Sequence, residues 1–414
     1  MFLIFYRRSK KLLPRKFKAF IKTKAGLLLL RIVFVFWPLR ASRIPKSSRI
    51  KISGTKYVAF LMYMANFGGL EKATLSLCKA IGRSHQVYLL YTSTDSEQYL
   101  LSEFKKCGVK LNHLGTTVSG IFEWLRQIRK IINISSKNFD VLCLENMPFG
   151  AEALPYIKKN NPNIKIICWI HGHYPMDLNL KMIAKFQGYI DQTIVLNDYF
   201  KNKLLKMGVR NVTILPNGVD ERLFDPETIK KRDAKKRLNI PLKKFVCAFI
   251  GRLYFDKNPL FIIEIARQIK DENIVFIVVG NGFLESELKQ QIKKYKLQDK
   301  VLQLDYQKDM HLVLAACDTL LITSPLEGMP LVVLEAMAMK VPPITFSFPG
   351  VSAIFKNGVH GFTVPLKPEH YIKAITCLKN DSKLYALMGK NCRERVLENF
   401  TLDRMVNNFV RVLK

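Results

Sequence analysis

Short apolar runs alternate with amphipathic stretches over most of the chain, and this repeat constrains the fold more than any other feature. In the first half, apolar runs with β-strand character lie at residues 57–63, 86–91, 141–144, 164–170 and 193–196. Helical stretches such as residues 70–81 and 122–132 lie between them. Short buried strands separated by helices predict a parallel sheet that is covered on both faces.

A second series of the same kind follows. Its predicted strands are residues 245–250, 274–279, 301–304, 319–323 and 342–345. The segment between the two series, residues 223–244, is rich in Lys, Arg, Asp and Pro and poor in strand-forming residues, so we interpret it as a linker. The sequence therefore predicts an α/β protein with two Rossmann-like, doubly wound domains. They would face each other across a cleft lined by the carboxyl ends of the strands.

This pattern gives a division of the chain into five parts. We expect an N-terminal extension at 1–56, a first domain at 57–222, a linker at 223–244 and a second domain at 245–395. A C-terminal helix at 396–414 would pack back on the first domain. The length of 414 residues suits more than one domain. The eight cysteines show no CxxC spacing and lie mostly in apolar runs, which predicts reduced core thiols and no metal site.

The extension is strongly basic. Residues 1–56 contain 16 of the chain's 66 Lys and Arg residues and no Asp or Glu, in a chain of net charge +33. Such a block favours an anionic partner, either phospholipid or nucleic acid. The basic residues are interleaved with aliphatic and aromatic ones and no nucleic-acid motif follows, so we predict an anionic membrane surface and no nucleic acid.

An apolar run within the extension decides how it would meet the membrane. Residues 25–39 are interrupted by Arg31, whereas a spanning helix needs about 20 apolar residues. We therefore predict a helix that lies in the membrane interface. A signal-anchor span and a disordered basic tail remain as alternatives.

The motif with the most candidate ligand-binding groups is the run EGMPLVVLEAMA at residues 327–338. It follows the predicted strand 319–323, so it lies where a strand turns into a helix, with Pro330 expected at the first helical position. Free backbone N–H groups at this turn would form an anion site; the segment is Met329, Pro330, Leu331 and Val332, of which Pro330 has no N–H of its own. The carboxylates of Glu327 and Glu335 can accept hydrogen bonds from hydroxyl groups.

Two glutamates separated by seven residues in this sequence context resemble the signature of glycosyltransferase family 4. That family consists of retaining enzymes with the GT-B fold, which is the two-domain architecture predicted above. The resemblance covers roughly residues 57–414 and is denser after residue 245. It implies that Glu327 contacts the donor sugar and that Glu335 holds the ribose of the nucleotide.

A second part of the resemblance is the stretch GRLYFDKNP at residues 251–259. In the family, a Gly-Arg-Leu…Lys stretch ends the first strand of the donor domain. It implies that Gly251 lets the backbone approach the donor and that Arg252 and Lys257 neutralise the diphosphate. Gly280 and Gly282 resemble the family's Gly-x-Gly loop near the nucleotide. Tyr306 and Gln307, after the next strand, would flank the base.

The first domain supplies further resemblances. Gly68 and Gly69 match a paired-glycine loop that opens a helix near the donor phosphate and the acceptor. His171 matches the family's histidine at the reaction centre, with His173 as a nearby competitor. The segment PNGVD at 216–220 would shape the cleft floor.

The sequence also departs from the family pattern. Met339 and Lys340 replace a small residue and glycine, and PGVSA at 349–353 replaces a Gly-Gly-x-x-Glu run, so a carboxylate is missing at Ala353. These departures bear on the identity of the donor more than on activity, because the residues expected to bind the phosphates and the ribose remain.

The resemblance implies a retaining hexosyltransferase. Its donor would be a nucleotide diphosphate sugar, a UDP-sugar in the first place and a GDP-sugar as the alternative. Its acceptor would be a lipid-linked saccharide or surface polysaccharide at the inner face of the cytoplasmic membrane. We expect no cofactor and no metal, since no Asp-x-Asp follows a strand. Alternatives are an epimerase or phosphorylase on the same fold, and a non-catalytic membrane-bound partner that binds nucleotide sugar.

Overall fold

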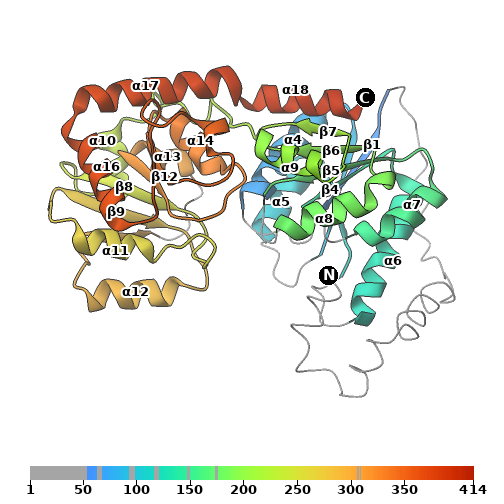
Figure 1. The fold of residues 1–414 in the computed structure, drawn as a ribbon, viewed down its shortest axis with the longest axis horizontal. Coiled ribbons are helices and arrows are strands. Elements are labelled where there is room, and N and C mark those ends of the chain that lie inside the picture. Colours follow the sequence, from blue (N-terminus) through green and yellow to red (C-terminus); the bar gives the residue numbers. More distant parts are fainter. Residues whose placement is uncertain are drawn as a thin grey trace, which may run out of the picture.

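The computed structural model describes residues 54–62, 68–92, 98–115, 121–146, 150–172, 176–304, 307 and 309–414. Nearly all of the basic extension lies outside these residues, so the predicted anchor stays a prediction. Within the described part of the chain, no helix is long and apolar enough to cross a membrane. Two α/β domains lie side by side, and the last two helices run across both of them (Figure 1).

The first domain contains a parallel sheet of seven strands in the order β3-β2-β1-β4-β5-β6-β7. The strands are β1 (Tyr57–Met62), β2 (Gln86–Tyr91), β3 (Lys110–His113), β4 (Val141–Glu145), β5 (Lys165–Ile170), β6 (Gln192–Val195) and β7 (Val212–Ile214). The helices are α4 (Gly69–Ile81), α5 (Gln98–Lys106), α6 (Ile121–Asn138), α7 (Leu154–Asn160), α8 (Met176–Phe186) and α9 (Asp198–Lys206).

The second domain repeats this plan with a parallel sheet in the order β10-β9-β8-β11-β12-β13. Its strands are β8 (Phe245–Ile250), β9 (Ile274–Val279), β10 (Val301–Leu304), β11 (Thr319–Ile322), β12 (Pro343–Phe346) and β13 (Phe362–Val364). Its helices are α11 (Phe261–Gln268), α12 (Glu285–Lys294), α13 (Met310–Ala315), α14 (Leu331–Ala338), α15 (Val351–Ile354) and α16 (Pro368–Asn380). The predicted fold class is confirmed in both domains.

The strands absent from the sequence-based prediction are β3, β7 and β13, and each lies at the edge of its sheet. An edge strand is covered less completely than a central one, so it can carry polar residues and loses the continuous apolar run. Strand β3, with the sequence KLNH, has no buried residue. The apolar pattern therefore identifies the central strands and, among the edge strands of the two sheets, only β10.

The strand order reverses at one point in each sheet. In the first domain this point lies between β1 and β4, and in the second between β8 and β11. Loops that leave the carboxyl ends of such neighbouring strands run in opposite directions and open a crevice for a ligand. The topology thus brings together the loops that follow β1 and β4 in the first domain, and those that follow β8 and β11 in the second.

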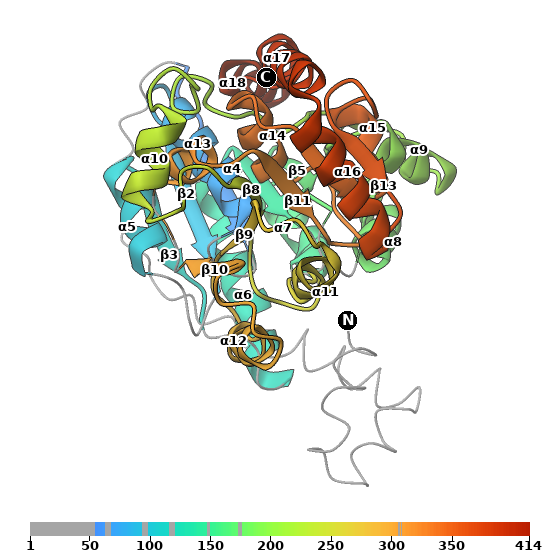
Figure 2. The same ribbon diagram turned by 90° about the vertical axis from the view of Figure 1, so that its left-hand side faces the viewer.

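The C-terminal helices tie the two domains together. Helix α17 (Ser382–Asn399) packs on α14 of the second domain, and α18 (Leu402–Leu413) packs on α4 of the first (Figures 1 and 2). Phe409 of α18 stacks on Phe60 and Trp169, with ring centroids 5.9 and 5.4 Å apart. Helix α17 continues past residue 395, so the chain leaves the second domain close to Phe400.

The interdomain crossing consists of two chain segments side by side. Val219 donates its N–H to the carbonyl of Phe400 (2.9 Å), and Leu402 donates to the carbonyl of Val219 (2.8 Å). The segment predicted as a linker also contains a helix, α10 (Lys231–Arg237), which packs on α13. All eight cysteines are free thiols, as predicted.

Candidate functional site

Two helix N-termini, one from each domain, face each other across the cleft. Helix α4 begins after Gly68 and α14 begins after Pro330, and neither of these two residues caps its helix through its own side chain. The carboxylate of Glu71 lies close to the start of α4, with its Oε2 2.6 Å from the position of a Cβ on Gly68. A Cβ placed on Gly69 would lie 3.9 Å from the side chain of Leu331, so the two ends are in close contact. The first N–H groups of a helix have no partner within it, and this end carries partial positive charge. Because Glu71 already lies beside the start of α4, the N-terminus of α14 is the better placed of the two to bind an anion.

The start of α14 is held in place by the first domain. Pro330 adopts an extended conformation (φ −66°, ψ 121°) and precedes the helix, whereas we predicted it at the first helical position. Asn217 donates to the carbonyl of Met329 (2.9 Å), and Asn197 donates to the carbonyl of Gly328 (3.1 Å).

The two domains also touch backbone to backbone. A Cβ on Gly328 would lie 2.3 Å from the carbonyl oxygen of His171, and one on Gly172 would lie 2.5 Å from the Cα of Gly328. Gly172 has a positive φ of 79° as well. No side chain fits between these segments, so the loop before α14 and the end of β5 require glycine.

Glu327 and Lys257, predicted to contact the sugar and the diphosphate respectively, form one ion-paired unit. The Nζ of Lys257 lies 2.5 Å from the Oε1 of Glu327. The hydroxyl of Ser324 donates to the same oxygen, also at 2.5 Å. Thr323 holds the lysine segment by donating its hydroxyl to the carbonyl of Lys257 (2.9 Å). Because the Glu327 side chain is only 10% exposed, these two donors fix its orientation.

Arg252 lies in the loop after β8, which also contains Lys257. Its guanidinium pairs with Asp256 (3.1 Å) and lies 5.4 Å from the ring centroid of Tyr254. Asp256 therefore pairs with Arg252 through a partly exposed contact, which a stronger anion can replace.

The glycine loop after β9 packs tightly on the β8 loop. A Cβ on Gly280 (φ 138°) would lie 2.0 Å from the carbonyl oxygen of Gly251, and Gly282 has φ 152°. By contrast, a Cβ on Gly251 would approach only the ring of Phe249, at 3.9 Å. Contacts within the protein thus explain the first two glycines, and the open side of Gly251 leaves room for a ligand.

Glu335 projects from α14 towards the first domain. Its side chain is 8% exposed, and the Nζ of Lys72 on α4 lies 3.8 Å from its Oε1. An ion pair therefore spans the cleft beside the two helix N-termini.

His171 follows β5 and forms a close pair with Glu145, the last residue of β4. The His171 Nε2 and the Glu145 Oε2 are 2.6 Å apart, and both side chains are buried. The backbone N–H of His171 donates to the Oδ1 of Asn146 (2.8 Å). The histidine ring also packs on Trp169, with a centroid distance of 4.6 Å.

The structure thus brings most of the predicted site residues to one cleft and adds others. The added residues are Lys72, Glu145, Asn197 and Ser324. Glu145 is the last residue of β4 and Ser324 comes two residues after β11, so both lie at the carboxyl ends of buried strands, which is a signal that the sequence does contain. Tyr306 and His173 lie outside the described residues. In the part of the chain that the structure describes, no group of three or more His, Cys, Asp and Glu residues is arranged to hold a metal.

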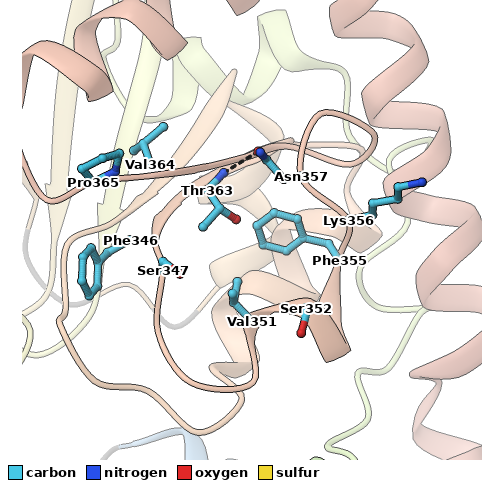
Figure 3. Close-up of a pocket in the computed structure, with 10 residues that line it drawn as sticks. All are labelled: Phe346, Ser347, Val351, Ser352, Phe355, Lys356, Asn357, Thr363, Val364 and Pro365. Carbon is cyan, nitrogen blue, oxygen red and sulfur yellow. Dashed lines mark hydrogen bonds between the residues drawn. The ribbon is translucent and has the colours of Figure 1, made fainter.

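A separate hollow lies at the carboxyl ends of β12 and β13 and contains none of the predicted site residues (Figure 3). It is lined by Phe346, Ser347, Val351, Ser352, Phe355, Lys356, Asn357, Thr363, Val364 and Pro365. The side chain of Asn357 accepts a hydrogen bond from the backbone N–H of Thr363 (2.8 Å) at its rim. Its lining is mainly apolar and offers little to a charged nucleotide.

Two family models match the two domains. The model described as Glycosyltransferase Family 4 matches residues 67–223, and the model described as Glycosyl transferases group 1 matches residues 230–395. The chain belongs to glycosyltransferase family 4. The two matches cover both domains, so the predicted resemblance to the family is confirmed for each of them.

Several curated relatives of this family 4 member are named as glycosyltransferases. The chain is 33% identical over 212 residues to the Escherichia coli UDP-Gal:alpha-D-GlcNAc-diphosphoundecaprenol alpha-1,3-galactosyltransferase, covering 50% of this chain and 54% of that protein. It is 25% identical over 244 residues to the putative teichuronic acid biosynthesis glycosyltransferase TuaC of Bacillus subtilis, covering 56% and 58%. The alignments thus span little more than half of these two relatives. The chain is 24% identical over 350 residues to the O-antigen biosynthesis glycosyltransferase WclY of Escherichia coli, and this alignment covers 76% of this chain and 96% of WclY.

Solved structures share the fold of this family 4 member. Anabaena Alr3699/HepE in complex with UDP and glucose superposes with a TM-score of 0.74 at 18% identity, covering 86% of this chain and 99% of that one. The sucrose-phosphate synthase of Thermosynechococcus elongatus gives a TM-score of 0.71 at 16% identity, covering 86% and 98%. These likenesses confirm the GT-B architecture.

Proposed function

We propose that this family 4 member is a retaining glycosyltransferase that moves a hexose from a nucleotide diphosphate sugar to a lipid-linked saccharide. The observation that carries the proposal is the ion-paired Lys257–Glu327 unit beside two facing helix N-termini. This arrangement offers cations and N–H groups for a diphosphate and a fixed carboxylate for sugar hydroxyls. A UDP-sugar is the favoured donor, because a relative uses UDP-Gal and HepE binds UDP.

The chemistry would rest on charge stabilisation. The leaving diphosphate gains negative charge as the glycosidic bond breaks, and Arg252, Lys257 and the N-terminus of α14 would stabilise it. Its phosphate oxygen would help to remove the proton of the acceptor on the same face of the sugar, which gives retention. Glu327, held by Ser324 and Lys257, would orient the sugar, and no protein nucleophile is required for this step.

The acceptor is proposed from the chain's charge and from its relatives. Residues 1–56 hold 16 cationic side chains and no acidic ones, which favours an anionic membrane surface. The Escherichia coli relative is named for a diphosphoundecaprenol-linked sugar. We therefore propose a lipid-linked saccharide at the inner face of the membrane, with the protein peripherally attached and without any role for nucleic acid.

A donor screen tests the function. Purified full-length protein would be incubated with UDP- and GDP-hexoses and a diphosphoprenyl saccharide, and the glycosylated lipid would be measured by mass spectrometry. We expect one UDP-hexose to give product with the anomeric configuration of the donor. Release of nucleotide without a glycosylated product would point to an epimerase or phosphorylase instead. Donor binding without turnover would point to a non-catalytic partner.

A further inference from the structure

The contact between Glu145 and His171 is an ionisable pair in the interior of the first domain. Glu145 ends β4, and in the sheet register it pairs with Trp169 of β5, two residues before His171. The His171 side chain is 4% exposed, the Glu145 side chain is fully buried, and the two are 2.6 Å apart. A buried carboxylate is costly, and an apolar residue of similar size would stabilise the domain at least as well. The pair therefore calls for a functional explanation.

The surrounding backbone holds His171 in a defined orientation. Asn146 has a positive φ of 47°, its side chain accepts the N–H of His171, and its own N–H donates to the carbonyl of Trp169 (2.9 Å). A left-handed conformation at a residue other than glycine is strained and persists only where its surroundings require it. Here that strained residue is the one that fixes the histidine main chain.

The second ring nitrogen of His171 has no such contact. Nδ1 is buried and has no hydrogen-bond partner among the described residues. A buried polar atom without a partner is rare in native proteins, so a ligand group is expected to supply one. The main chain of His171 lies against Gly328, the residue next to Glu327. The main chain of His171 therefore lies at the contact between the two domains, beside the carboxylate that we propose for the sugar.

Glu145 determines which nitrogen of the ring is free. An ionised carboxylate only accepts hydrogen bonds, so the Nε2 that faces it must carry the hydrogen. In the neutral ring, Nδ1 is then the acceptor. We propose that Glu145 is a positioning residue that fixes this tautomer of His171 and so presents Nδ1 to a hydroxyl of the donor sugar. The inference rests on the proposed transferase function and names a sugar contact from the first domain.

The substitution Glu145→Gln tests the inference. The amide keeps the shape but can donate to Nε2, which allows the opposite tautomer. We expect kcat/KM to fall about 10- to 100-fold and the affinity for the nucleotide sugar to fall, with the affinity for the free nucleoside diphosphate within about twofold. His171→Ala should cause a similar loss, and the double variant should lose no more than His171→Ala. Glu152→Gln, a half-buried glutamate of the same domain outside the site, is the matched control.

A spectroscopic measurement keeps the inference testable apart from the reaction. Nitrogen-15 NMR of the histidine ring should show hydrogen on Nε2 in the wild-type protein and on Nδ1 in Glu145→Gln. Glu145→Asp, which keeps the charge, should retain the wild-type tautomer and serves if the Gln variant does not fold. Full transfer activity in Glu145→Gln, multiplied losses in the double variant, or an unchanged ring pattern would each overturn the role of Glu145. Absence of transfer in the wild-type protein would overturn the proposed function but would leave the ring measurement valid.

Discussion

Individual glycines show how the same residue type serves two purposes in the cleft. Gly280 is needed within the second domain, because its positive φ and its 2.0 Å approach to the carbonyl of Gly251 exclude any Cβ. Gly328 is crowded mainly by the first domain, through His171 and Gly172, and its φ is not positive. Replacement of these two glycines should therefore affect different properties.

We expect Gly328→Ala to fold normally and to lose interdomain closure. The added methyl group would lie 2.3 Å from the carbonyl oxygen of His171, so the domains must separate. Turnover should fall by about tenfold or more, because misplacement by about 1 Å costs that much, and small-angle scattering should show a larger radius of gyration. Gly188→Ala, where a Cβ would meet no atom within 4 Å, is the control. A compact and fully active Gly328→Ala protein would contradict the closed arrangement.

The charges proposed for the diphosphate make a second prediction at this scale. Arg252→Ala and Lys257→Ala should each lower kcat by about 100-fold, since they act on charge that grows in the transition state. The thermal midpoint should change little in Arg252→Ala, because a partly exposed ion pair of this kind contributes little to stability. Steady-state kinetics and calorimetric melting would measure both. Near-normal turnover in both variants would exclude these residues from the diphosphate site.

Glu335 is the residue that we expect to hold the ribose of the nucleotide. We expect Glu335→Ala to weaken nucleotide-sugar binding by about 1–3 kcal/mol, because a ribose hydroxyl would lose its acceptor. Isothermal titration would measure the change. The variant Lys72→Ala separates this effect from loss of the cleft-spanning ion pair, since it removes the pair but keeps the carboxylate. Unchanged affinity in Glu335→Ala would remove that residue from the ribose site.

Among the elements, α10 shows how a segment without an apolar pattern is held in place. Lys231 pairs with Asp318 (2.6 Å), and Lys235 approaches the other oxygen of Asp318 (3.5 Å). Asp318 also accepts the backbone N–H of Val246 at the start of β8 (2.8 Å). Burial lowers the pKa of Lys231, but the contacts with Tyr385 and Asp318 outweigh it and leave that pKa raised. The cluster lies at the amino ends of β8 and β11, away from the cleft.

We expect Asp318→Asn to lower stability without affecting the site. The loss of one charged partner for two lysines should cost about 2 kcal/mol, after allowance for the partial exposure of Lys231. That corresponds to a thermal midpoint lower by about 4–8 °C. Donor affinity, measured by titration at 20 °C, should stay within about twofold. A large loss of donor affinity at an unchanged midpoint would show that this cluster communicates with the cleft.

For the molecule as a whole, the described domains contain the candidate nucleotide site and the extension contains the basic charge block. The carbonyl of Lys56 accepts the N–H of Gln86 (3.0 Å), so the first domain begins before β1 and a truncation should spare this residue. We expect a protein that lacks residues 1–53 to bind donor normally and to bind anionic vesicles poorly. Each cationic residue near the surface contributes about 1 kcal/mol towards acidic lipid.

Vesicle sedimentation at two salt concentrations measures this effect. Binding of the full-length protein should weaken as salt is raised, since the Debye length falls to about 3 Å at 1 M. Transfer to a lipid-linked acceptor should fall in the truncated protein much more than transfer to a detergent-soluble analogue. Equal vesicle binding by both proteins would place the membrane contact elsewhere and would weaken the case for a lipid-linked acceptor.

The sequence by itself determined the central strands, the two-domain plan and the motif that contains Glu327 and Glu335. These features are local: an apolar run needs only its own residues to be recognised, and the motif lies within one strand-to-helix turn. The edge strands β3, β7 and β13 were missed because partial exposure removes the apolar signal.

Only the tertiary structure decided which residues meet. Glu145 and His171 are 26 residues apart in the chain and become neighbours because β4 and β5 pair in one register. Lys72 reaches Glu335, and Asn217 reaches Met329, only because the two domains close on each other. Such contacts depend on the packing of whole elements, and no periodicity along the chain encodes which two side chains will face each other.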